Sequence, residues 1–293
     1  MGGGRRSFRT SEDGGNRIEG DLIEEYQKHH DIQGTDYRYI ETADDLRKWK
    51  ADGMTDYVLG MKIRFAYREL QYHCELQSIP GLFSNSHMKY MTDREENDEQ
   101  PTLSEMADAA IERLQQSDEG FFLLVEGGRI DHAHHDNFAK RAMEETIELE
   151  NAVKVAMEKT NPEDTLIIVT ADHSHSVTIN GYPIRGTPIL GSHFHNPYSM
   201  SPYPTGENLA YATISYANGL GYFDHVTNDI NVPWKDFREF TKEQYEDPDF
   251  RQPAMMPPPE VSETHGGEDV GIFARGNIKF YDFERFLLKF HTF

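Results

Sequence analysis

The sequence predicts an α/β protein with a parallel sheet, and three consecutive stretches carry this prediction. Residues 120–126, GFFLLVE, form a short continuous apolar run, as expected of a strand that is buried on both faces. Residues 139–160 have apolar side chains at helical spacing, and DTLIIVT at 164–170 is a second apolar run. A strand, a helix and a strand joined by short connections form a βαβ unit, and such units build parallel sheets.

Further elements are expected on both sides of this unit. Before it, the sequence predicts helices over 21–31, 43–50 and 104–117 and strands over 36–40 and 56–63, with Thr42 capping the second helix. After it, charged residues and prolines become frequent, and DVGIFARG at 269–276 returns as a last strand. We therefore expect an α/β domain made of 1–189 and 262–293, and a loop-rich insertion over 190–261.

Composition narrows the possible partners of the chain. The 293 residues carry a formal net charge of −22, and such an acidic surface repels nucleic-acid phosphates, so we exclude DNA and RNA as partners. A phosphorylated substrate would need local cations, which bound metal ions can supply. The single cysteine, Cys74, excludes an intramolecular disulfide and a multi-cysteine zinc site. We expect no signal peptide, membrane span or lipid-anchor signal, so localisation stays unassigned.

Three segments rich in imidazole and carboxylate groups lie next to predicted strands. VEGGRIDHAHH (125–135) and ADHSH (171–175) each follow a strand, and ETHGGEDV (263–270) precedes one. Ligands of open α/β sheets bind at the carboxyl ends of the strands. Imidazole and carboxylate groups suit zinc, and carboxylates with water suit magnesium. Each segment alone could equally be a histidine-rich loop or a polar turn, but the three together favour a metal site.

The spacing within these segments suggests how ions could be held. Asp131 and His135 are four residues apart, so one helical turn places both side chains on the same face. Asp172 and His173 are adjacent at a strand end, where both could reach a second ion. Glu126 is the last residue of its predicted strand.

These segments, together with NGYPIRG (180–186) and YANGLGY (216–222), resemble the animal alkaline phosphatases in order and spacing. The resemblance covers most of residues 30–276. It implies an alkaline-phosphatase-like parallel-sheet sandwich, incomplete in this chain, with 190–261 as the crown-like insertion. It also implies the metal ligands, which are Asp131, His135 and His265 for a first zinc, Asp172 and His173 for a second zinc, and Glu126 for magnesium.

Further roles follow from the same resemblance. His132 would face the bound phosphate through water, and His175 would orient Asp131, as partners of metal ligands commonly do. Tyr182 would reach across the interface of a homodimer. The implied reaction is the zinc- and magnesium-dependent hydrolysis of phosphomonoesters through a phosphoserine intermediate.

The family's nucleophile lies in an Asp-Ser-Ala segment, and this segment does not occur in the sequence. We therefore expect an N-terminally truncated chain with a divergent C-terminus and little or no phosphatase activity. The alternative is a catalytically inactive product that binds metal or forms dimers. A sulfatase or a phosphoglycerate mutase is a weaker alternative, because Cys74 in HCELQS does not match a sulfatase nucleophile.

Overall fold

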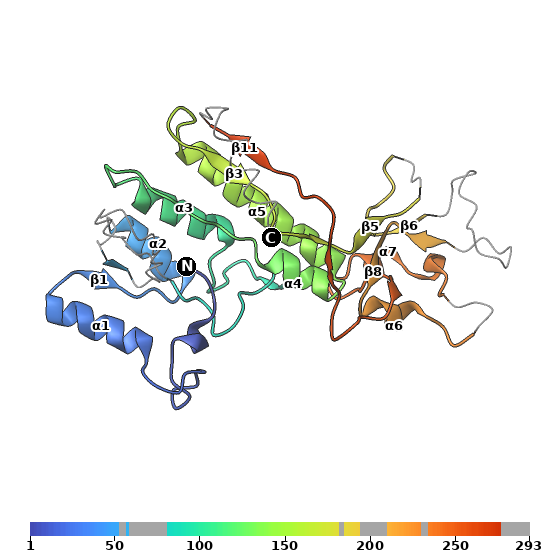
Figure 1. Ribbon diagram of the computed structural model, residues 1–293, viewed down its shortest axis with the longest axis horizontal. Helices are drawn as coiled ribbons and strands as arrows, with labels where there is room; N and C mark the ends of the chain where they lie inside the picture. Colours follow the sequence, from blue (N-terminus) through green and yellow to red (C-terminus); the bar gives the residue numbers. More distant parts are fainter. Residues whose placement is uncertain (53–56, 59–80, 182–184, 194–209, 230–233, 277–293) are drawn as a thin grey trace. The chain divides into compact units, whose positions relative to one another are not determined.

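The computed structural model describes residues 1–52, 57–58, 81–181, 185–193, 210–229 and 234–276 (Figure 1). The chain divides into two compact units, Met1–Glu126 with Glu148–Lys159, and Gly127–Ile147 with Thr160–Phe293. Helix α5 (Ala139–Lys159) contributes its first residues to the second unit and its last residues to the first. Among the described residues, no helix combines the length and the apolar character that crossing a bilayer requires.

The first unit is mainly helical. It contains α1 (Leu22–Gln33), α2 (Ala43–Ala51), α3 (Leu103–Leu114), two short 3₁₀ helices (Arg5–Ser7 and Met91–Asp93), and strands β1 (Tyr37–Arg38) and β2 (Tyr57–Val58), which pair in parallel. The predicted cap is confirmed, since the Thr42 hydroxyl accepts a hydrogen bond from the Asp45 amide at the start of α2. Helix α3 begins with a reciprocal capping box between Thr102 and Glu105.

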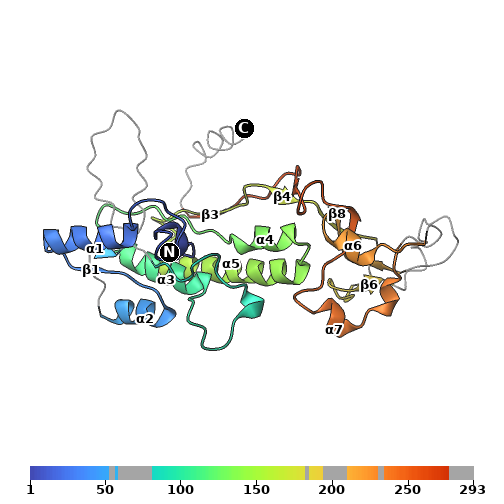
Figure 2. The same ribbon diagram turned by 90° about the horizontal axis from the view of Figure 1, so that it is seen from below.

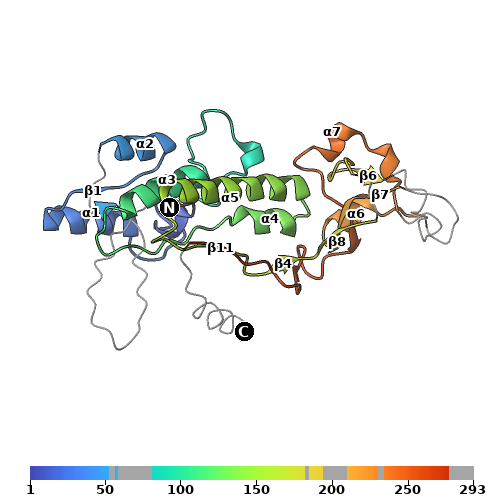
Figure 3. The same ribbon diagram turned by 90° about the horizontal axis from the view of Figure 1, so that it is seen from above.

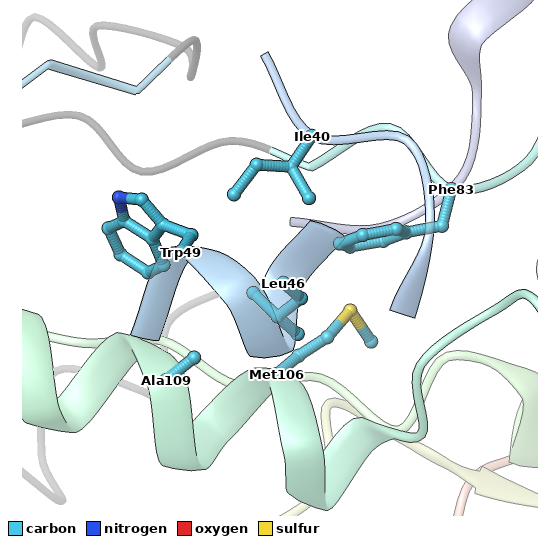
Figure 4. Close-up of a cluster of buried hydrophobic side chains, with 6 residues drawn as sticks. All are labelled: Ile40, Leu46, Trp49, Phe83, Met106 and Ala109. Carbon is cyan, nitrogen blue, oxygen red and sulfur yellow. The ribbon is translucent and has the colours of Figure 1, made fainter. Parts of the chain in front are cut away.

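Helix α2 packs against α3 in the core of the first unit (Figure 4). Leu46 and Trp49 are three residues apart on one face of α2, and Met106 and Ala109 repeat this spacing on α3. Leu46 is only 2% exposed and Trp49 only 1%. This burial of apolar surface provides the main hydrophobic stabilisation of the contact.

Ion pairs join α2, α3 and the end of α5 at the edge of this core. Lys50 pairs with Asp108, and Lys159 Nζ lies 2.6 Å from Asp108 Oδ1 and 2.8 Å from Glu112 Oε2. Burial alone would raise the pKa of Asp108, but hydrogen bonds from Lys159 and Lys50 hold it below the ordinary 3.8.

The second unit combines short strands with helices. Its helices are α4 (Arg129–His135), the start of α5, α6 (Gly221–His225), a 3₁₀ turn (Phe237–Glu239) and α7 (Lys242–Tyr245). Its strands are β3 (Ile167–Val169), β4 (Ser174–His175), β5 (Val177–Ile179), β6 (Ser192–His193), β7 (Tyr211–Ala212), β8 (Ile214–Asn218), β9 (Ala254–Met256), β10 (His265–Gly266) and β11 (Phe273–Arg275).

These strands form small sheets. β5, β8 and β9 form a three-stranded sheet in which β8 pairs antiparallel with β5 and parallel with β9. The pairs β3–β11, β4–β10 and β6–β7 are antiparallel. Helix α4 lies alongside the start of α5 in both turned views (Figure 2, Figure 3).

The expected strand over 120–126 is wrong, because the structure has no strand there. Phe122 is 84% exposed and Leu124 is 78% exposed. Consequently β3 does not belong to the predicted parallel βαβ pair, and its partner is the antiparallel strand β11. An apolar run becomes a strand only where a neighbour supplies hydrogen bonds, and the described residues provide none here.

Replacing Leu46 by alanine should lower the free energy of unfolding by about 2–5 kcal/mol, because the change leaves a cavity between α2 and α3. Urea unfolding followed by circular dichroism would measure the loss. The exposed neighbour Lys48, changed to alanine on the same helix, is the matched control and should unfold within about 0.5 kcal/mol of wild type. Equal effects of the two changes would contradict this packing.

Acid should weaken the pairing of Asp108. Because its pKa is lower in the folded chain, its stabilising contribution is present above the ordinary 3.8 and is lost as the pH falls through the folded value. Asp108→Asn should therefore cost about 0.5–1 kcal/mol at neutral pH and less with increasing acidity. Urea unfolding at several pH values would measure this change in the free energy of unfolding, with Asp118→Asn at an exposed position as the control. A cost of Asp108→Asn that does not depend on pH would refute the prediction.

Candidate metal centre

Three elements of the second unit bring several of the predicted site residues together. Helix α4 carries Asp131 and His135, β4 ends at His175, and β10 begins at His265. The antiparallel pairing of β10 with β4 sets His265 opposite His175, although the two are far apart in sequence. Gly266 allows this close pairing, because a Cβ at this position would lie only 2.8 Å from the His175 carbonyl oxygen.

The turn between α4 and α5 fixes the position of α4. Asn137 is fully buried with φ of 60°, the left-handed region that asparagine adopts more readily than most residues. Its side-chain oxygen accepts a hydrogen bond from the Gly221 amide at 2.9 Å, and its carbonyl accepts one from the Gln252 amide at 2.9 Å. The turn is therefore tied to α6 and to the chain just before β9.

Asp131, His135 and His265 point their ligand atoms at one another. Asp131 Oδ1 lies 3.4 Å from Nε2 of both His135 and His265, and the two Nε2 atoms are 3.2 Å apart. A tetrahedral zinc with bonds of about 2.0–2.1 Å separates its ligand atoms by about 3.3–3.4 Å. The triangle therefore fits three protein ligands of a single zinc ion.

The hydrogen bonds of the other ring nitrogens favour the ligand form of two histidines. His135 Nδ1 donates to the Glu263 carbonyl at 2.6 Å, and His173 Nδ1 donates to the Ser174 carbonyl at 3.1 Å. When Nδ1 carries the proton in a neutral imidazole, Nε2 keeps its lone pair for a metal. Both rings therefore direct a basic nitrogen into the cluster.

Asp172 and His173 form a second possible ligand pair. Their Oδ2 and Nε2 atoms are 3.4 Å apart, and His173 Nε2 lies 3.8 Å from Asp131 Oδ1. The Asp172 side chain is 87% exposed, so this side of the cluster faces solvent. The rings of His173 and His265 stack with centroids 3.4 Å apart and planes inclined by 16°.

His175 lies between two carboxylates. Nε2 is 3.0 Å from Asp131 Oδ1, and Nδ1 is 2.7 Å from Glu263 Oε2. Burial alone would lower the pKa of His175, but its hydrogen bond to Glu263 and the charges of Glu263 and Asp131 raise it. Burial alone would raise the pKa of Asp131, whereas its interactions with His135 and His175 hold it below the ordinary value. The protonated ring can therefore donate to both carboxylates.

Three further residues were predicted for the site, and they are His132, Glu126 and Tyr182. His132 Nδ1 lies 3.2 Å from Arg129 Nη1 on α4. Glu126 belongs to the first unit and is exposed, so its assignment to magnesium stays a prediction. Tyr182 lies outside the described residues.

Two residues that the sequence did not single out support the cluster. Glu263 is 1% exposed and contacts His135 and His175. It lies two residues before His265, and in an extended segment this spacing places both side chains on the same face, which could have indicated Glu263 as a site residue. His134 Nδ1 lies 2.9 Å from the hydroxyl of buried Tyr216. Burial lowers the pKa of His134 to about 4, so this ring is neutral near pH 7.

A family model described as alkaline phosphatase matches residues 69–285, a range that contains the whole cluster. The chain belongs to the alkaline phosphatase family. It is 44% identical to alkaline phosphatase 4 of Drosophila melanogaster over 209 residues, which cover 69% of this chain and 33% of that protein. It is 37% identical to the membrane-bound alkaline phosphatase of Bombyx mori over 290 residues, 94% of this chain and 44% of that protein.

The chain thus spans less than half the length of these two alkaline phosphatases. Among solved structures, the alkaline phosphatase of Thermus thermophilus is 27% identical, with a TM-score of 0.46, and the match covers 61% of this chain and 32% of that one.

Asn137→Ala should lower the free energy of unfolding of the chain by about 1–3 kcal/mol, because it leaves the buried Gly221 amide without its acceptor and strains the left-handed turn. Thermal unfolding would measure the change. Lys154→Ala, on an exposed position of α5, is the control and should leave the transition unchanged. A melting curve of the Asn137 variant that coincided with wild type would refute the role of this turn.

Proposed function

We propose that this member of the alkaline phosphatase family binds zinc through Asp131, His135 and His265, as part of a centre for phosphomonoester hydrolysis. The observation that supports this proposal is the separation of 3.2–3.4 Å between their three ligand atoms. It matches the ligand spacing of tetrahedral zinc. Three protein ligands leave one position open, as in catalytic rather than structural zinc sites.

Two residues beside this site extend the proposal. Asp172 and His173 would hold a second zinc on the exposed side of the cluster. The family resemblance separately assigns Glu126, in the first unit, to magnesium. When bound, two such zinc ions polarise a phosphoryl oxygen and make water or a hydroxyl more acidic. His175 holds Asp131 in place through a hydrogen bond of 3.0 Å, and His132 would orient water toward the phosphate.

Electrostatics supports a metal-dependent reaction. The formal charge of −22 disfavours the approach of a phosphate dianion to this chain. Divalent cations at the cluster would reverse the local sign of the potential, because bound ions are often the largest charges in a site. We therefore propose that substrate binding depends on prior loading of the centre with metal.

A non-catalytic role is the second candidate, and one observation favours it. The Asp-Ser-Ala segment of the family's nucleophile does not occur in the sequence, so no serine is assigned to a phosphoserine intermediate here. In this role the chain would bind metal, and it would associate with a second subunit without hydrolysing phosphate esters. Homodimer formation through Tyr182 stays a prediction.

Zinc titration of the purified chain in competition with a chromophoric chelator tests the centre. Wild type should bind zinc, and His135→Ala and His265→Ala should each weaken zinc binding by at least about 100-fold. Loss of a residue that only hydrogen-bonds to a metal ligand already lowers metal affinity by about 10–100-fold, so loss of the ligand itself should cost more. His87→Ala, an exposed histidine in the first unit, is the matched control. Unchanged affinity in the His135 and His265 variants would rule out this site.

Hydrolysis of p-nitrophenyl phosphate by the same samples separates the two candidate functions. Turnover that requires zinc and is lost in His135→Ala would support the phosphomonoesterase. Zinc binding without turnover would favour the non-catalytic role.

A further inference from the structure

We propose that Glu263 is the positioning residue that sets the geometry of the Asp131–His135–His265 site. The inference rests on the proposed zinc binding and goes beyond it, since Glu263 would not itself contact the metal. A residue of this kind determines how well the ligand atoms match the coordination geometry, and hence the affinity for the ion.

The carboxylate of Glu263 is completely enclosed, with 0% of the side chain exposed. Oε1 accepts hydrogen bonds from the Ser176 amide at 2.7 Å and from the Ser176 hydroxyl at 2.6 Å. Oε2 accepts from His175 Nδ1 at 2.7 Å. Three short donors therefore offset the cost of burying this charge and allow the side chain a single position.

The backbone of Glu263 holds the end of helix α4. Its amide donates to the His135 carbonyl at 3.0 Å, and its carbonyl accepts from His135 Nδ1 at 2.6 Å. The two bonds fix both the position and the ring orientation of His135. Since the carboxylate is anchored to Ser176, the backbone that makes these bonds is anchored as well.

All three ligands of the first site consequently depend on this one residue. Asp131 is reached through the ring of His175, whose Nε2 lies 3.0 Å from Asp131 Oδ1. His135 is bound by the Glu263 backbone directly. His265 follows two residues later in the chain, so anchoring Glu263 also sets where β10 begins.

Two substitutions separate the reach of this side chain from its charge. Glu263→Asp keeps the charge but shortens the side chain by one methylene, so that it cannot contact His175 and Ser176 together. Glu263→Gln keeps the length of the side chain. The neutral tautomer of His175 that carries its proton on Nε2 can accept a hydrogen bond at Nδ1 from the new amide and can still donate from Nε2 to Asp131. A positioning role therefore predicts that the aspartate variant is impaired and the glutamine variant is not.

The experiment measures zinc affinity by chelator competition at a fixed pH near neutrality, using the full chain. Glu263→Asp and Glu263→Ala should weaken zinc binding by about 10–100-fold, the usual effect of removing the partner of a metal ligand. Glu263→Gln should stay within about threefold of wild type, as should Glu260→Ala, an exposed glutamate three residues earlier. Visible spectra of the cobalt-substituted proteins should show tetrahedral intensity for wild type and the glutamine variant, and weaker bands for the aspartate variant.

Each outcome decides the proposal. If the Glu263→Asp protein binds zinc as tightly as wild type, the proposal is overturned. It is also overturned if Glu263→Gln loses as much zinc affinity as Glu263→Asp, because the charge of the side chain would then be the important property. If the alanine variant does not fold, the aspartate and glutamine variants still decide between reach and charge. A wild-type chain that binds no zinc would overturn the proposed function as well, whereas the first two results would leave that function intact.

Discussion

The centre depends on a very short piece of antiparallel sheet. Only two residue pairs link β10 to β4, yet they bring His265 opposite His175 across a separation of many residues. Glu263 then joins the same strand segment to the end of α4. Because each connection is small, most of the rigidity of the cluster comes from charge-assisted hydrogen bonds of buried side chains rather than from extensive apolar packing.

The arrangement of polar groups explains how so many titratable residues can occupy one place. Asp131 and Glu263 are separated by the ring of His175, which pairs with both of them. His134 lies beneath this ring as a neutral imidazole, with ring centroids 4.7 Å apart, and is hydrogen-bonded to Tyr216. Alternation of negative, positive and neutral groups avoids direct contact between like charges, which would be costly in a partly buried site.

Local patterns in the sequence predicted much of this arrangement. The spacing of four between Asp131 and His135 placed both on one helical face, and caps and apolar periodicity located α1, α2, α3 and α5 to within a few residues. Local patterns did not predict which strands pair, because strand pairing depends on residues that are distant in sequence. The run 120–126 looked like a strand and is not one, and β3 pairs with β11 instead. The spacing of two from His265 could have placed Glu263 near the site, but its hydrogen bonds to His135 and Ser176 join residues that are remote in sequence and could not be foreseen.

The stacked rings of His173 and His265 restrict each other's motion. Neither imidazole can turn far about its Cβ–Cγ bond without tipping an edge of its ring into the face of the other, because close-packed groups resist displacement. If His173 and His265 hold the two zinc ions proposed above, an ion bound by one ring would therefore also restrict the rotation of its neighbour. The thickness of an aromatic ring thus sets the separation of these two imidazoles.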